Sequence, residues 1–161
     1  MALQVTELAI WERLAAIEDI RCLKARYFRC VDTKLWPEFR ALFTDDATLY
    51  FPEAYDKPSP ISKSYPAIAA LLDDAVSIHH GHMPEIEVLD ADNARAIWSM
   101  EDEVFLPGKP DEGIPPSTIL GAGHYHETYR REAGQWKIAS LELTRLRHEV
   151  IQNPVKNGTG G

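Results

Sequence analysis

The sequence predicts an α+β fold, in which helices from the N-terminal half cover one face of a curved antiparallel sheet. Two patterns point to this class. Up to about residue 75, apolar residues recur at three- and four-residue steps, whereas from residue 79 onward they alternate with polar ones. Helices that precede the strands as a group are typical of a helical layer packed on one face of a sheet. A curved sheet capped by a long helix leaves a cavity between the two layers.

Three helices are expected before residue 79. The first is a long amphipathic helix from Thr6 to about Val31, with Thr6 as its N-cap. Its apolar positions are Ile10, Leu14, Ile17, Leu23, Tyr27 and Val31. A short second helix begins at Trp36-Pro37, because proline suits the first helical turn. Four prolines predict a loop over residues 52–66, and the third helix is expected at 67–75.

One short and four long strands complete the expected fold. The short strand is expected at residues 47–51, and the long ones at 79–89, 94–106, 118–132 and 135–148. The proline- and glycine-rich stretch 107–116 is expected to form a flap over the pocket. Residues 1–150 form a single domain in this interpretation, and residues 151–161 form a flexible C-terminal tail.

Composition excludes several functions. A formal net charge of −8 argues against a nucleic-acid partner, which requires a basic face. No apolar stretch reaches the roughly 20 residues of a membrane helix, and the charged N-terminus does not resemble a signal peptide. Cys22 and Cys30 lie about 12 Å apart along one predicted helix, too far for a disulfide. A cytoplasmic protein with core thiols is expected, acting on a small molecule.

Half of the six histidines lie in the segment His79-His80-Gly81-His82. Imidazole takes up and releases protons near neutral pH and also binds metals, so the cluster indicates acid–base chemistry or a metal site. His124 and His126 repeat the two-residue spacing of His80 and His82, yet no carboxylate completes a recognisable ligand set. We therefore expect no metal and no cofactor. Strand or surface histidines without chemistry remain the alternative for His82, His124 and His126.

Strand alternation places two charged residues on apolar faces. Asp102 shares the phase of Trp98 and Met100, and Arg145 continues the row of Leu141 and Leu143. Buried carboxylates with perturbed pKa values gather at functional sites, although a structural Asp102–Arg145 ion pair is a plain alternative.

Asp32 stands at the end of the first predicted helix, where a carboxylate opposes the helix dipole. It is either functional or the start of the turn that follows.

Five pieces of the chain, taken together, resemble the SnoaL-like branch of the nuclear transport factor 2-like (cystatin-like) superfamily. They are residues 27–32, 79–86, 98–102 and 134–136, followed by Arg145. Within that branch they look most like the bacterial bile-acid 7α-dehydratases, with scytalone dehydratases as more distant relatives. The resemblance implies a cone-shaped α+β barrel, a homo-oligomer, trimeric in preference to dimeric, and a small hydrophobic substrate. Residues 52–66 and 107–117 do not match the family pattern.

The resemblance also implies an active site of Tyr27, Asp32, His79, Asp102 and Arg145. His79 is expected to act as the base, with Asp102 orienting it and Arg145 fixing Asp102. Tyr27 is expected to hydrogen-bond the substrate oxygen, and Asp32 to tune Tyr27 or to bind a substrate hydroxyl. Expected substrate contacts are His80, His82, Trp98 and His124.

The function implied is a cofactor-independent dehydratase, a lyase acting on a carbonyl-activated steroid-like or polycyclic hydroxy compound. The alternatives are an isomerase of the ketosteroid type and a non-catalytic module that binds hydrophobic ligands.

Overall fold

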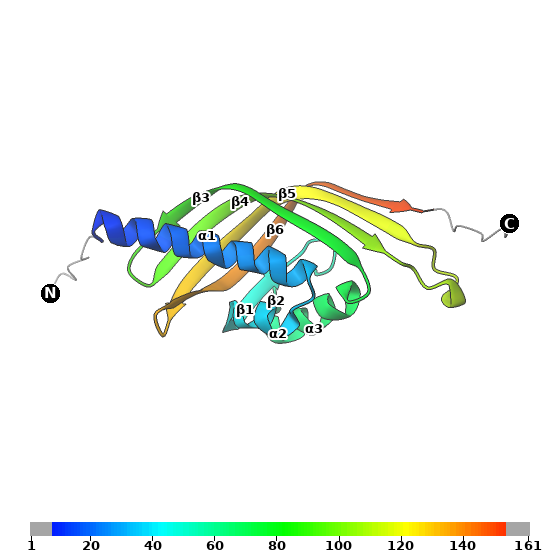
Figure 1. Cartoon of the computed structure of the whole chain (residues 1–161), viewed down its shortest axis with the longest axis horizontal. Coiled ribbons are helices and arrows are strands. Elements are labelled where there is room, and N and C mark those ends of the chain that lie inside the picture. The colour runs from blue at the N-terminus through cyan, green and yellow to red at the C-terminus, as the bar shows by residue number, and fades with distance from the viewer. Residues whose placement is uncertain (1–7, 154–161) are drawn as a thin grey trace.

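A long helix lies across one face of a six-stranded sheet in the computed structural model, which describes residues 8–153 (Figure 1). This helix, α1 (Ile10–Asp32), is followed by the shorter helices α2 (Trp36–Ala41) and α3 (Ile61–Leu72). Both short helices lie near the C-terminal end of α1, while the start of α1 and the end of β6 lie at opposite ends of the described structure (Figure 1). The expected α+β class is confirmed.

Helix α1 buries one face from Ala16 onward, whereas Ile10 and Leu14, expected on that face, are exposed. Its buried residues recur at steps of three and four: Ala16, Ile20, Leu23, Lys24, Tyr27, Cys30 and Val31. The helix begins at Ile10, where the backbone N–H of Ala9 donates to the Glu12 carboxylate at 2.9 Å. The proposed N-cap Thr6 lies outside the described residues. Cys30 is buried, but Cys22 is exposed and is not the core thiol expected.

The segment expected to be a loop over residues 52–66 is partly helical, and α3 begins six residues earlier than expected, at Ile61. Pro60 precedes the first helical turn, where its missing N–H costs no hydrogen bond. Pro66 lies inside the helix, on its exposed side. Because proline has no N–H, it cannot donate the helical hydrogen bond to the carbonyl of Ser62, which is also an exposed residue. Proline therefore did not mark a loop here.

The sheet is mixed and unclosed, which corrects the expected antiparallel cone. Its strands are β1 (Phe43–Tyr50), β2 (Ser59–Pro60), β3 (Val76–Val88), β4 (Asn93–Leu106), β5 (Ser117–Glu132) and β6 (Gln135–Gln152). Their spatial order is β2-β1-β6-β5-β4-β3. Strands β3 to β6 form an antiparallel meander, as expected from their short turns, but β1 pairs with β6 in parallel. Alternation within a strand predicts its faces and carries no information on the direction of its neighbour.

The ends of the long strands differ from expectation in two places. Strand β6 continues to Gln152, which pairs with Ser117, so residues 151 and 152 belong to the sheet, and residues 154–161 lie outside the described part. The connection 107–116 contains a short 3-10 turn, η1 (Pro110–Glu112), and contributes no residue to the pocket described below.

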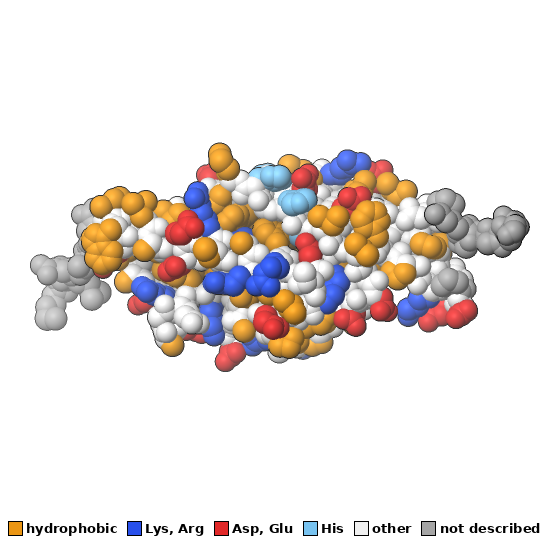
Figure 2. Space-filling view, viewed as in Figure 1, with side chains coloured by type: hydrophobic (Ala, Val, Ile, Leu, Met, Phe, Trp, Pro, Cys, Tyr) orange, Lys and Arg blue, Asp and Glu red, His pale blue; other side chains and the backbone are white. Residues whose placement is uncertain are grey.

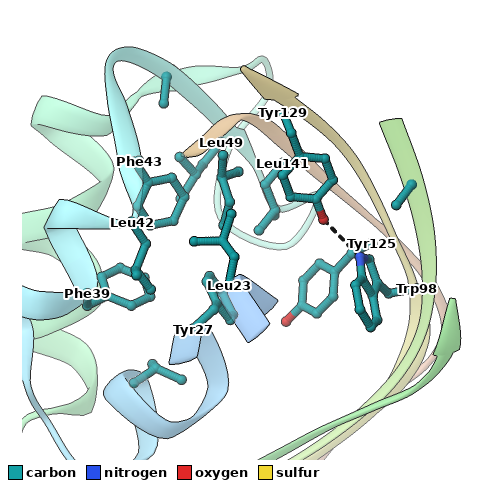
Figure 3. Packing of buried hydrophobic residues seen from close by; sticks show 14 of the residues in the cluster. Leu23, Tyr27, Phe39, Leu42, Phe43, Leu49, Trp98, Tyr125, Tyr129 and Leu141 are labelled. Carbon is teal, nitrogen blue, oxygen red and sulfur yellow. Dashed lines mark hydrogen bonds between the residues drawn. The ribbon is translucent and has the colours of Figure 1, made fainter. Parts of the chain in front are cut away.

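The core fills the space between α1 and the inner face of the sheet. Tyr27 from α1 meets Tyr125 from β5 at a ring-centroid distance of 6.0 Å, and Phe39 and Phe43 pack on its other side (Figure 3). These edge and tilted contacts are the arrangements that aromatic rings favour. Across residues 8–153, we find no helix with the length and apolar character to cross a bilayer.

Candidate active site

A pocket of about 360 Å³ opens between the inner face of the sheet and a roof built from residues 51–55 and α3. Its apolar lining is Val31, Phe51, Ala54, Tyr55, Ala67, Ile68, Leu71, Leu72, Val104, Ile119 and Leu143. Its polar lining is Tyr27, Glu53, His79, Asp102, Tyr125, Arg145 and His148. An apolar chamber with a few convergent polar groups is typical of a small-molecule site.

His79 and Asp32 form a tightly coupled pair at this pocket. The His79 Nδ1 atom lies 2.6 Å from Asp32 Oδ1, and the His79 backbone N–H donates to Asp32 Oδ2 at 2.9 Å. Burial alone would raise the pKa of Asp32, but these hydrogen bonds and one from Ser77 outweigh it and lower the pKa. Because an ionised carboxylate only accepts, Nδ1 donates to Asp32, so in the neutral imidazole the lone pair is on Nε2. The sequence predicted that Asp102 would orient His79, but the structure pairs His79 with Asp32 instead.

The end of α1 determines where Asp32 lies. The N–H of Leu35 donates to the Cys30 carbonyl at 2.9 Å, which closes the helix in a Schellman-type turn. Lys34 takes the left-handed conformation that this turn requires, with φ of 60°. Its ammonium donates to the Ser77 hydroxyl at 2.8 Å, and Ser77 donates to Asp32 at 2.9 Å. The position of the Asp32 carboxylate is therefore fixed both by the turn that ends α1 and by residues of β3.

Asp32→Asn is expected to lower the free energy of unfolding at pH 7 by about 1 kcal/mol or more, since hydrogen bonds to a charged group are lost. The pKa of Asp32 is depressed in the folded state, so its contribution is present above the unfolded value near 3.8 and fades as the pH falls below it. Urea unfolding at pH 7 and at pH 3 checks this. An equal difference between variant and wild type at both pH values would contradict it.

Asp102 and Arg145 form the second charged pair, as the strand alternation indicated. Arg145 Nη1 donates to both Asp102 oxygens, at 3.1 and 2.9 Å. Gly121, the cross-strand neighbour of Asp102, makes the approach feasible: a Cβ there would lie 2.0 Å from Asp102 Oδ1 and 2.1 Å from Arg145 Nη1. A third residue, Glu53, joins the pair, because Arg145 Nη2 donates to Glu53 Oε1 at 2.6 Å.

Two tyrosine hydroxyls complete the polar end of the pocket. Burial, more than any nearby charge, raises the pKa of Tyr27 and that of Tyr125 above the ordinary phenol value. Both phenols therefore stay protonated across the physiological pH range and act as hydrogen-bond donors. Tyr27 lines the pocket, as its expected role of hydrogen-bonding the substrate oxygen requires. Tyr125 was not predicted from the sequence.

A buried polar network lies behind the two tyrosines. Lys24 is fully buried, pairs with Glu127 on β5, and places its ammonium 3.9 Å from the ring centroids of both Tyr27 and Tyr125. Glu127 also accepts from the hydroxyl of Tyr129, which accepts from the Trp98 indole at 2.9 Å (Figure 3). Trp98 was expected to contact the substrate, but it packs in the core and does not line the pocket.

The other histidines expected at the substrate lie on the opposite face of the sheet. His80 and His82 are exposed, with Nδ1 and Nε2 at 3.9 and 3.4 Å from the same Glu101 oxygen. Exposed histidine and acidic side chains are visible together on the molecular surface (Figure 2). His124 also lies outside the pocket lining, at 6.5 Å from the ring of His126. Within residues 8–153, no group of three or more histidine, cysteine or acidic side chains is placed to hold a metal ion.

The five residues of the expected active site do come together, since Tyr27, His79, Asp102 and Arg145 line the pocket and Asp32 supports His79. Sequence reasoning missed Glu53, because it lies in a segment without a motif. Gly121 had a readable signal: glycine inside a strand often marks a close approach.

Comparison with known proteins agrees with this architecture. A family model for the SnoaL-like domain matches residues 12–142. A probable cyclase of Gibberella zeae is 27% identical over 154 residues, which cover 89% of this chain and 99% of the cyclase. A hexachlorocyclohexane dehydrochlorinase (LinA) of type 2 is similar in structure, with a TM-score of 0.72, 20% identity, and coverage of 92% of this chain and 99% of that chain.

A candidate scytalone dehydratase from Novosphingobium aromaticivorans has the same TM-score of 0.72, at 18% identity, and covers 92% of this chain and 98% of that chain. At such low identity, the two solved structures establish the fold alone. The family model spans most of the sequence, including the residues from Tyr27 to Asp102 that line the pocket. The chain therefore belongs to the SnoaL-like domain family.

Proposed function

We propose that this protein is a cofactor-independent dehydratase that removes water from a carbonyl-activated, polycyclic or steroid-like hydroxy compound. The observation that carries the proposal is the His79–Asp32 pair at 2.6 Å, set in an apolar pocket beside two protonated tyrosines. A base fixed in one tautomer and a donor for a developing oxyanion are the two groups that this elimination needs.

The proposed reaction begins with proton abstraction by His79. Its Nε2 takes the proton from the carbon next to the substrate carbonyl, while Asp32 holds the imidazole and stabilises its cationic form. The Tyr27 hydroxyl donates to the carbonyl oxygen as negative charge develops there. The imidazolium then protonates the hydroxyl on the adjacent carbon as its C–O bond breaks, so that an enone and water leave. Asp102 and Arg145 shape the wall of the pocket beside His79.

The names of similar proteins support elimination chemistry but do not identify the substrate of this protein. The names of the similar proteins include a dehydrochlorinase and a candidate dehydratase, which remove hydrogen chloride and water, and a probable cyclase. A pocket of about 360 Å³ suits a fused-ring compound. Kinship with the bile-acid 7α-dehydratases is part of this proposal and rests on the five motif positions.

Mass spectrometry of products tests the proposal. The purified protein is incubated with a panel of β-hydroxy ketones on fused rings, including steroid and polyketide types. Dehydration is expected to give a loss of one water that needs catalytic amounts of protein. A product of unchanged mass with a shifted double bond would indicate the isomerase instead, and binding without turnover would indicate a non-catalytic module.

The proposed assembly is a homo-oligomer, a trimer in preference to a dimer. This assignment rests on the family resemblance. Light scattering of the purified chain gives the mass directly, and a monomeric mass would overturn it.

A further inference from the structure

The guanidinium of Arg145 has its donors committed to protein carboxylates. Nε and Nη2 donate to Glu53 Oε1 at 3.1 and 2.6 Å, and Nη1 donates to both oxygens of Asp102. Arginine presents five N–H groups in a fixed fork, and each of its three nitrogens donates to a protein carboxylate. The Arg145 side chain is only 14% exposed. An anionic substrate would therefore have to compete with two carboxylates for Arg145.

The remaining charges of the pocket reinforce this. Among the described residues that line it, Arg145 is the one lysine or arginine, whereas Glu53 and Asp102 are both carboxylates. Asp32 adds a further negative charge behind His79, and the other basic groups of the lining are the imidazoles of His79 and His148. Acidic groups thus outnumber the guanidinium in a chamber that is otherwise apolar, where charges are poorly screened.

We propose that the pocket takes an uncharged ring compound and that Glu53 is the residue that excludes anions from it. This inference rests on the proposed function only in taking this pocket as the substrate site. Glu53 lies on the segment between β1 and β2, in the roof of the pocket. Without Glu53, two nitrogens of Arg145 would face the pocket unpaired and would offer a carboxylate a bidentate partner.

The geometry of the roof supports the same role. Glu53 extends from the segment that covers the pocket to strand β6 on the sheet side, and its side chain is 26% exposed. Burial is the largest single influence and would raise the pKa of Glu53, but the hydrogen bond from Arg145, a backbone hydrogen bond and the charge of Arg145 together lower the pKa. Glu53 therefore stays ionised at neutral pH, when a substrate enters.

A matched pair of probes tests the inference: 2-acetylnaphthalene, which is neutral, and 2-naphthoate, which has the same ring system and a carboxylate. Their dissociation constants are measured by fluorescence titration at pH 7 with wild type, Glu53→Gln and Asp56→Asn. Asp56 is an exposed acid of the same segment that does not line the pocket, so its variant controls for net charge. Wild type is expected to favour the ketone by about tenfold or more, as like charges disfavour association.

Glu53→Gln is expected to tighten naphthoate binding by about tenfold, with little change for the ketone, because charge pairing with Arg145 becomes available. Asp56→Asn should leave the ratio of the two constants unchanged. Preference of wild type for naphthoate, an unchanged ratio in Glu53→Gln, or binding of neither probe would each overturn the inference. Since binding needs no turnover, repeating the titrations with His79→Ala separates this result from the fate of the dehydratase proposal.

Discussion

Replacing His79 by alanine is expected to lower kcat for dehydration by about 10²–10⁴-fold, the contribution typical of a positioned general base. The physical reason is the tautomer that Asp32 imposes: with the proton on Nδ1, Nε2 is the basic atom at the pocket. KM should change little, because the apolar lining supplies most of the contact with substrate. Steady-state kinetics on the β-hydroxy ketone that the product screen identifies would measure both constants.

The neighbouring histidine provides the control for this experiment. His80 follows His79 directly but lies on the outer face of the sheet with its side chain 61% exposed, so His80→Ala should retain wild-type kcat. Asp32→Asn should also lower kcat, and the double variant with His79→Ala should be no slower than His79→Ala alone, because the two residues act as one unit. Near-native turnover in His79→Ala would contradict the mechanism.

Lys24→Met is expected to lower the free energy of unfolding by about 3–5 kcal/mol, because it leaves the buried carboxylate of Glu127 without its counter-ion. Lys24 and Glu127 are both fully buried, and burial lowers the pKa of Lys24 against the attraction of Glu127. Replacing both partners should recover much of the loss, since a buried ion pair contributes little net stability over neutral residues. Lys24→Met/Glu127→Gln removes both charges and keeps an acceptor for the Tyr129 hydroxyl.

Equilibrium urea unfolding measures the free energies for these variants. The matched control is an exposed ion pair: Arg95 and Glu87 are 63% and 55% exposed at 2.6 Å, so Arg95→Met should make no measurable difference. If Lys24→Met unfolds at the same urea concentration as Arg95→Met, the buried pair is not the stabilising contact that its burial indicates. If the double variant is as unstable as the single one, the loss arises from packing around Lys24 and not from the stranded charge.

Much of the fold could be predicted from local pattern. The step of three and four residues predicted α1, and alternation predicted β3 to β6 together with the inward phase of Asp102 and Arg145. These succeed because periodicity reports which side of an element is buried. The parallel pairing of β1 with β6 escaped prediction, since strand direction depends on residues far apart in the chain. The helix that starts at Ile61 was not predicted, because the four prolines of residues 52–66 suggested a loop.

The sequence by itself indicated five residues that come together at the pocket, but only the tertiary structure decided how they pair and added Glu53 and Tyr125. The sequence assigned Asp102 to His79 and Asp32 to Tyr27 or a substrate hydroxyl, but Asp102 lies opposite His79 in the strand register while Asp32 makes the hydrogen bond. The reason is the turn after α1, which aims Asp32 at His79, and the space at Gly121, which lets Arg145 reach Asp102. Pairing among charged groups is settled by distances of a few tenths of an ångström, which alternation and motif order do not encode.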